Sequence, residues 1–232
     1  MATTLPLAGK AAFDELERAV KDLGLKGVLM NAQVDGHPVD SRELWPVDKK
    51  VSKLSVPIFI HPSIKVLGFD ACKAPYDLFR TIGREFDLEL ATLRVCVGGV
   101  LEEFPDLKIV VAHFGGGFSS IKERMDRYIR YMGPKFWTGK PLIGEPYFEQ
   151  YNKHFSRLYF NMAGREIGVQ TTQCALTNIR PDRLLFGTDY PPNFINDGKG
   201  MGTYIKKIKQ LKMDKKTIEG MLGINAIKLF RI

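Results

Sequence analysis

Hydrophobic positions along the chain fall into short apolar, β-branched runs separated by longer stretches with helical spacing. Such runs are typical of parallel strands that are buried on both faces of a sheet. They alternate with helical periodicity, as in Phe13, Leu16, Val20 and Leu23. We therefore predict an α/β fold built from strand–helix units. The predicted strands span residues 25–31, 56–60, 107–112, 157–162 and 183–188.

The number of these units is lower than a closed barrel requires. A (β/α)₈ barrel has eight strands, whereas the pattern gives five units and a further strand remnant at residues 3–5. We expect a single domain over residues 1–232 of the (β/α)₈ type that lacks its first strands. The uncovered sheet edges predict a homo-oligomer that buries them.

Helices are expected between the strands, with breaks at glycine. The segment 76–104 has helical spacing but contains Gly83, Gly98 and Gly99. The segment 133–146, rich in proline and glycine, is expected to be a surface loop. Further helices are predicted at residues 11–23, 40–53, 118–132 and 166–176 and in two or three segments near the C-terminus.

Three of the strands end at a residue that can carry chemistry. Residues 56–60 are followed by His61, 107–112 by His113, and the run at 183–188 by Asp189. The carboxyl ends of parallel strands meet at one face, so these side chains are expected to share a pocket. The alternatives are a core histidine, a plain turn and a capping or ion-paired aspartate.

His113 precedes Phe114 and three glycines, Gly115, Gly116 and Gly117. We expect these glycines to bring backbone amide donors to the N-terminus of the next helix. An imidazole beside such donors suits general acid–base work on a substrate with a carboxylate or a developing oxyanion. The sequence therefore favours His113 as a catalytic residue.

Charge and composition narrow the classes of function. The net charge is +8 and the isoelectric point is about 9.3, but the C-terminal lysines alternate with apolar residues at helical spacing. We therefore expect solvated helix faces, no nucleic-acid partner and a small anionic substrate. No apolar run is long enough for a membrane span and the N-terminus has no signal-peptide pattern, so a cytoplasmic protein is expected.

These motifs, in this order, resemble the amidohydrolase-related (amidohydrolase 2) family and its decarboxylase branch. The branch includes aminocarboxymuconate semialdehyde and γ-resorcylate decarboxylases. The resemblance covers nearly the whole chain. The motifs are Ile60-His61-Pro62, Val111-Ala112-His113-Phe114-Gly115-Gly116-Gly117 and Leu185-Phe186-Gly187-Thr188-Asp189-Tyr190-Pro191.

The resemblance implies a barrel with a divalent metal, most often zinc and sometimes manganese. It implies that His61 and Asp189 bind the metal and that His113, with Asp189, moves protons. A small carboxylated substrate would lie against Gly115, Gly116 and Tyr190, and Arg124 would bind its carboxylate in the neighbouring subunit. The residues that the resemblance assigns to the site are His61, His113, Arg124, Asp189, Tyr190, Gly115 and Gly116.

The family's first strand carries a His-x-His or Glu-x-His motif, which this sequence does not contain. A catalytic zinc needs about three protein ligands. Two functions therefore remain open: a metal-dependent hydrolase or non-oxidative decarboxylase, and a catalytically silent barrel with a structural or interaction role.

Overall fold

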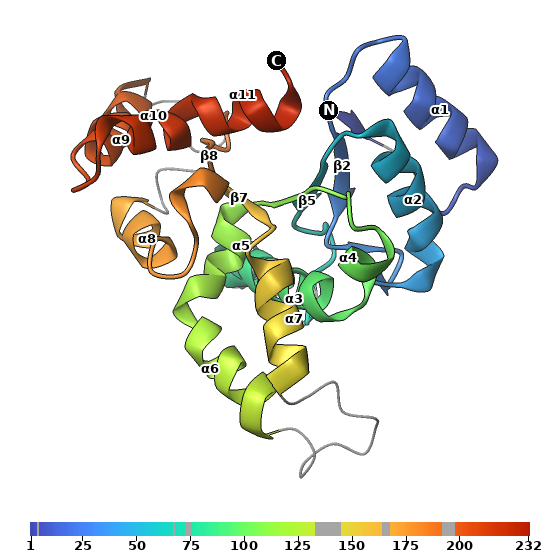
Figure 1. Cartoon of the computed structure of the whole chain (residues 1–232), viewed down its shortest axis with the longest axis horizontal. Helices are drawn as coiled ribbons and strands as arrows, with labels where there is room; N and C mark the ends of the chain where they lie inside the picture. The colour runs from blue at the N-terminus through green and yellow to red at the C-terminus, as the bar shows by residue number, and fades with distance from the viewer. Residues whose placement is uncertain (4, 67, 73–75, 133–144, 164–167, 192–197) are drawn as a thin grey trace.

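A six-stranded parallel sheet lies at the centre of the fold (Figure 1). Neighbouring strands follow one another in the chain, apart from a small hairpin inserted after the second. In spatial order they are β1 (Ala2–Thr3), β2 (Val28–Asn31), β5 (Ile58–His61), β6 (Ile109–Val111), β7 (Tyr159–Met162) and β8 (Leu184–Phe186). The predicted α/β fold with an incomplete set of barrel strands is confirmed.

We describe the chain from a computed structural model. It describes residues 1–3, 5–66, 68–72, 76–132, 145–163, 168–191 and 198–232. Within these ranges the sheet does not close, and β1 and β8 form its two edges. Residue 4 of the predicted strand remnant, most of the predicted loop at 133–146 and the first two residues of the helix predicted at 166–176 lie outside the described residues.

Helices connect the strands and cover the sheet. Before β6 lie α1 (Lys10–Lys21), α2 (Trp45–Leu54), α3 (Arg84–Val97) and α4 (Val100–Glu103), with a π-helical turn, η2 (Phe79–Gly83), leading directly into α3. After β6 lie α5 (His113–Gly117), α6 (Lys122–Arg127), α7 (Glu145–Phe155), α8 (Gly168–Ala175), α9 (Gly198–Lys209), α10 (Lys215–Glu219) and α11 (Asn225–Phe230).

Two helix predictions can be compared directly with the structure. The break at Gly98 and Gly99 is confirmed, because α3 ends at Val97 and Gly99 has a φ of 88°. Helix α7 was not predicted: its first two residues fall in the predicted loop 133–146, and no element was predicted for the rest of it. Proline is tolerated in the first turn of a helix, where its missing N–H has no helical acceptor.

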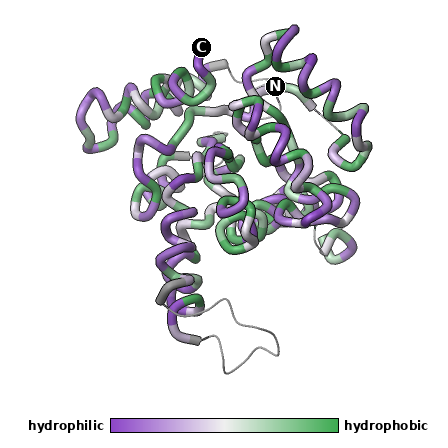
Figure 2. Tube along the Cα trace, turned by 45° about the vertical axis from the view of Figure 1, so that its right-hand side comes forward, coloured by the Kyte–Doolittle hydropathy of each residue, from purple (hydrophilic) through white to green (hydrophobic). Residues whose placement is uncertain are grey.

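The two faces of the sheet bury different partners. Ile58 and Ile60 point into the main core, where they pack with side chains of the helices that cover this face, including α1, α2 and α3. Phe59 points the other way, and with Val110 and Leu185 it packs against side chains of α11. Figure 2 shows hydrophobic residues concentrated in the central segments and hydrophilic residues on much of the periphery.

The two ends of the chain lie close together (Figures 1 and 2). A Cβ added at Gly27, just before β2, would lie 3.3 Å from the ring of Phe230 and 3.7 Å from Met1. Helix α11 therefore packs against the amino ends of β1 and β2. Among the described residues, none of the helices combines the length and apolar character needed to cross a membrane.

A small two-stranded hairpin extends beyond the carboxyl end of β2. It pairs β3 (Gln33–Val34) with β4 (His37–Pro38) in antiparallel fashion. Its turn residues, Asp35 and Gly36, have φ values of 49° and 82°. An Asp-Gly pair with positive φ at both positions favours a tight two-residue turn.

Candidate active site

The two strand-end histidines lie side by side. His61 is the last residue of β5 and shares a strand face with Phe59, whereas His113 follows β6 by two positions. Their ring centroids are 6.4 Å apart and the rings are nearly perpendicular. Asp189, which follows β8, is close enough for its carboxylate to act on the charge of His61. The structure thus brings the three predicted side chains to one rim.

The surroundings of His61 favour its neutral form. Burial, followed by the nearby Arg84 guanidinium, lowers the pKa of His61, while the Asp189 carboxylate acts in the opposite direction. Its Nδ1 lies 3.1 Å from the carbonyl oxygen of Pro62, and its Nε2 lies 3.4 Å from Arg84 Nη2. A neutral ring that donates from Nδ1 to Pro62 turns its Nε2 lone pair toward the guanidinium.

His113 has a carboxylate partner that the sequence did not reveal. Its Nδ1 lies 2.8 Å from Oε1 of Glu85, in the first turn of α3. This hydrogen bond holds the buried ring in the tautomer with a proton on Nδ1. Arg84 and Glu85 therefore contact His61 and His113, respectively. The acidic first turn of α3 could have suggested Glu85, but the long helical pattern of 76–104 did not locate that turn.

The segment after β6 differs from the prediction. Residues His113–Gly117 all have positive φ values, between 49° and 81°, and form one left-handed helical turn instead of the N-terminus of a right-handed helix. A 3₁₀ turn, η3 (Phe118–Ser120), and α6 follow it. His113 and Phe114 are in a conformation that costs non-glycine residues about 1–2 kcal/mol each.

Close packing explains two of the three glycines in this turn. A Cβ at Gly115 would lie 2.8 Å from Thr92 Oγ1, and one at Gly116 would lie 2.0 Å from the carbonyl oxygen of Glu85. The turn therefore packs directly against the backbone of α3 and sets the position of Glu85 beside His113. Whether Gly115 and Gly116 also contact substrate stays a prediction.

A second carboxyl group lies one turn further along α3. Burial, followed by the negative charge of Glu85, raises the pKa of Glu89 to about 7. The backbone nitrogen of Glu89 would lie 2.8 Å from a Cβ at Gly116, so Glu89 borders the same left-handed turn. Glu89 is thus close enough to Glu85, the partner of His113, for the charge of one carboxyl group to act on the other.

Asp189 and Tyr190 follow β8 in a tight turn. Asp189 has a φ of 51°, the Tyr190–Pro191 peptide bond is cis, and Tyr190 N–H donates to Thr188 Oγ1. The Tyr190 side chain is 66% exposed. It is therefore available to a ligand, although its role in substrate binding stays a prediction.

Arg124 does not join the histidines among the described residues. It lies on α6, which extends away from the sheet (Figure 1), and its guanidinium packs over the Tyr128 ring at 4.9 Å. Its side chain is exposed. A role for Arg124 in the site of a second subunit stays a prediction.

The set of metal ligands is incomplete. In the part of the chain that the structure describes, no three His, Cys, Asp or Glu side chains are placed to hold one ion. The predicted pair of ligands, His61 and Asp189, is fewer than a catalytic zinc needs. The free ring nitrogen of His61 also faces a cation, Arg84. The described residues alone therefore do not fit a metal site.

A cleft of about 1100 Å³ opens beside this rim. Its walls are residues at the carboxyl ends of β1 and β2 and residues that follow β1, β2 and β5, including Asn31 at the end of β2 and Ser63 after β5. Asn31 is the sheet partner of His61, so the cleft reaches the strand position next to that histidine. It offers space for a small molecule at the carboxyl ends of the strands.

Comparisons with known proteins agree with this architecture. The chain is 26% identical over 229 residues to a 2-amino-3-carboxymuconate-6-semialdehyde decarboxylase of Dictyostelium discoideum, covering 94% of this chain and 57% of that protein. It is 31% identical over 193 residues to a γ-resorcylate decarboxylase of a Polaromonas species, covering 78% and 56%. The chain thus spans little more than half the length of these relatives.

Solved structures support the fold. A 2,6-dihydroxybenzoate decarboxylase in complex with 2,6-dihydroxybenzoate has a TM-score of 0.79 and 24% identity, covering 100% of this chain and 70% of that chain. A manganese-bound dihydroxybenzoic acid decarboxylase of Polaromonas has a TM-score of 0.73 and 25% identity, covering 95% and 65%.

A protein-family model described as "Amidohydrolase" matches residues 1–232, the full length of the sequence. The match includes His61 at the end of β5, His113 after β6 and Asp189 after β8. The chain belongs to the amidohydrolase family.

Proposed function

We propose that this chain functions as a non-oxidative decarboxylase of small carboxylated aromatic substrates. The observation that carries the proposal is the pair of strand-end imidazoles, one of them held by Glu85, in a chain whose relatives are named as decarboxylases. Because the chain spans little more than half of those relatives, their activity is a proposal for this chain. The ligand of a neighbour of the same fold, 2,6-dihydroxybenzoate, indicates the substrate class.

In this reaction the bond between the ring carbon and the carboxylate breaks. Carbon dioxide leaves, the electron pair stays on the ring carbon, and a proton takes the place of the carboxylate. His113 is the proton donor in our proposal. Its Nδ1 is engaged by Glu85 at 2.8 Å, so its Nε2 would deliver the proton, and the carboxylate would stabilise the charged ring beforehand.

The remaining predicted site residues complete the proposal. Asp189 would act on the charge of His61 and move protons, and Tyr190 would border the substrate. Gly115 and Gly116 would shape the wall beside His113, and Arg124 would act only in the site of a second subunit. We prefer decarboxylation to hydrolysis as the reaction, because the named relatives are decarboxylases. The carboxyl and imidazole groups would serve to transfer protons in it.

A divalent metal is part of the proposal but not of the step derived above. Manganese is bound in one neighbour of the same fold, and zinc is the ion that the sequence resemblance favours. When bound, such an ion would polarise oxygen atoms of the substrate. His61 and Asp189 would need at least one further ligand that the described residues do not provide.

The test is turnover of 2,6-dihydroxybenzoate to resorcinol, followed by chromatography and by carbon dioxide release. We expect His113→Gln to lower kcat by about 100-fold, a typical loss for a general acid. His37→Gln is the matched control, because His37 lies in the β4 hairpin and contacts Glu43 at 3.6 Å. Equal rates in wild type and His113→Gln would contradict the proposal.

The alternative is a catalytically silent scaffold, and the incomplete ligand set favours it. Metal content separates the two functions. About one zinc or manganese per chain after purification without added metal, lost in His61→Ala and Asp189→Ala, would support the enzyme. Absence of metal above background, together with absence of turnover, would support the scaffold.

A further inference from the structure

Arg84 lies against His61 with no carboxylate partner among the described residues. Arg84 is the first residue of α3 and is half-buried. Within the ranges that the structure describes, no carboxylate oxygen lies within 4.0 Å of its guanidinium, and its one hydrogen-bond contact is Nε2 of His61 at 3.4 Å. A half-buried cation is costly unless an anion compensates it.

Neighbouring arginines on the same helical segment are paired. Arg80, one turn earlier in η2, contacts Asp77 at 2.7 Å. Arg94, near the end of α3, contacts Asp40 at 2.6 Å. Of these three arginines, Arg84 is the one that contacts an imidazole, His61, and it has no carboxylate partner among the described residues.

The hydrogen-bonding capacity of Arg84 points to an anion. A guanidinium has five N–H donors in a planar fork, and one of them, on Nη2, is directed at the lone pair of neutral His61. The remaining donors match the geometry of a carboxylate, which accepts two parallel N–H bonds. His61 thereby orients Arg84, while its own Nδ1 is fixed on the carbonyl of Pro62.

We propose that Arg84, oriented by His61, binds the carboxylate of the substrate beside the strand-end histidines of the same chain. The inference rests on the proposed decarboxylase function for the identity of the ligand. The carbon that bears the carboxylate is also the carbon that must receive the proton. A carboxylate held beside His61 places that carbon on the side of His113, whose ring centroid is 6.4 Å from that of His61.

Arg84 and Arg124 are alternative binding residues for the substrate carboxylate, and they differ in whether a second subunit is needed. Arg124 packs on Tyr128 and needs a second subunit to reach a substrate. Arg84 is already in contact with His61 and needs no second subunit. Variants of the two arginines therefore test different models of carboxylate recognition.

Binding of two ligands that differ by the carboxylate tests the proposal directly. The probes are 2,6-dihydroxybenzoate and resorcinol, measured by calorimetry on the full chain. We expect wild type to bind the acid more tightly than resorcinol. We expect Arg84→Met to weaken acid binding by about tenfold or more without affecting resorcinol, and Arg84→Lys to recover part of the loss, because lysine keeps the charge but not the planar fork.

Arg80→Met is the control, since Arg80 is exposed and paired with Asp77. It should leave both dissociation constants unchanged, and circular dichroism should show that all variants fold. Three outcomes would overturn the proposal. Arg84→Met could bind the acid as tightly as wild type does, or wild type could fail to bind the acid. The third is loss of acid binding in Arg124→Met but not in Arg84→Met. Carboxylate-dependent binding without turnover would contradict the decarboxylase function only, and turnover with unchanged binding in Arg84→Met would contradict only the role of Arg84.

Discussion

The hydrogen bond between Glu85 and His113 decides which ring nitrogen carries the proton. In Glu85→Ala, the Nδ1–H tautomer of His113 should lose its preference, and kcat should fall by about tenfold or more because the charged ring is no longer stabilised. Nitrogen-15 NMR of the histidine rings reports the tautomer, and a turnover assay reports kcat.

Glu103→Ala is the control for this experiment, because Glu103 is exposed at the end of α4. A His113 ring that keeps the same tautomer in Glu85→Ala would show that Glu85 does not position it.

Asp48 predicts a pH dependence of stability. Asp48 is 1% exposed in the first turn of α2, burial raises its pKa to about 7, and its Oδ2 has no hydrogen-bond partner among the described residues. The unfolded chain ionises this group near pH 4, whereas the folded chain keeps it protonated up to about pH 7. The free energy of unfolding should therefore fall as pH rises from about 4 to about 7 and then level off.

Asp48→Asn should remove that loss. We expect it to raise the free energy of unfolding at pH 8 by about 4 kcal/mol and to change little at pH 4. Urea unfolding at both pH values measures the difference. Asp14→Asn, an exposed residue paired with Lys10, is the control. Equal effects of Asp48→Asn at both pH values would contradict the account.

Among the elements, the left-handed turn offers the clearest packing test. Gly116→Ala places a Cβ 2.0 Å from a backbone oxygen of α3, at a φ of 72°. Gly117→Ala has a similar φ of 81° but nothing within 4 Å of its Cβ. We expect Gly117→Ala to cost about 1 kcal/mol and Gly116→Ala about 3 kcal/mol, because backbone must move in the second case only.

Urea unfolding of both glycine variants measures these costs. Gly116→Ala should also weaken turnover, since it displaces Glu85 from His113. Equal stability losses at the two positions would show that backbone strain, and not contact with α3, determines the need for glycine.

Sequence patterns predicted the strands and the convergence of their ends, because burial on both faces leaves a local signal at every strand. They did not predict the left-handed turn, since glycines are compatible with several backbone conformations. They also missed Arg84 and Glu85. Both are polar residues near the start of a helix, and their importance depends on which strand ends the helix packs against, which is a non-local property.

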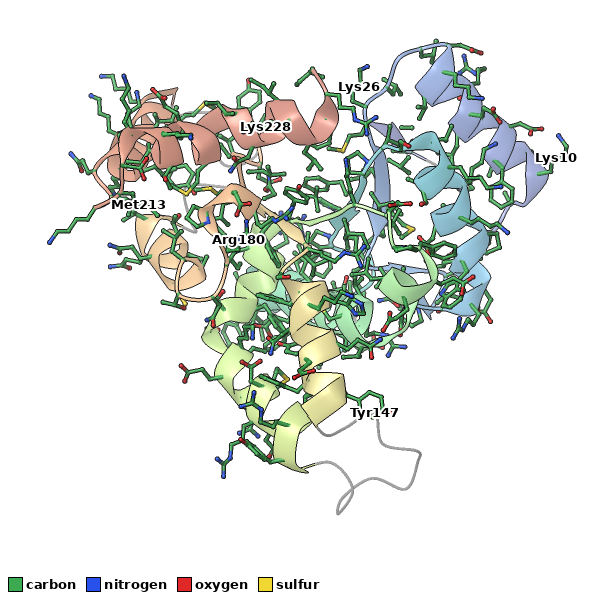
Figure 3. The ribbon with its side chains drawn as sticks, in the orientation of Figure 1. Lys10, Lys26, Tyr147, Arg180, Met213 and Lys228 are labelled. Atoms are coloured by element: carbon green, nitrogen blue, oxygen red, sulfur yellow. The ribbon has the colours of Figure 1, made fainter. Side chains whose placement is uncertain are left out.

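At the scale of the whole molecule, an unpaired apolar stripe accompanies the open sheet. Its four exposed side chains are spaced four residues apart along η2 and α3: Leu78, Ile82, Phe86 and Leu90. Figure 3 shows side chains over the ribbon in the view of Figure 1. Exposed apolar stripes of this kind favour association.

We expect a dimer or larger assembly at micromolar concentration, as the uncovered sheet edges also predict. Phe86→Lys should shift the mass measured by light scattering toward the monomer. Leu23→Lys is the matched control, because Leu23 is 56% exposed and Phe86 is 54% exposed. A wild-type monomer at that concentration would contradict the prediction.

The adjacent positions of Arg84 and Glu85 have a mechanical consequence. Two consecutive residues of α3 contact two imidazoles that lie at the ends of different strands. A small rotation of α3 about its axis would loosen one contact as it altered the other. Carboxylate binding by Arg84 and proton donation by His113 would then change together whenever α3 moves. Association of a second molecule with its exposed apolar stripe is one event that would move it.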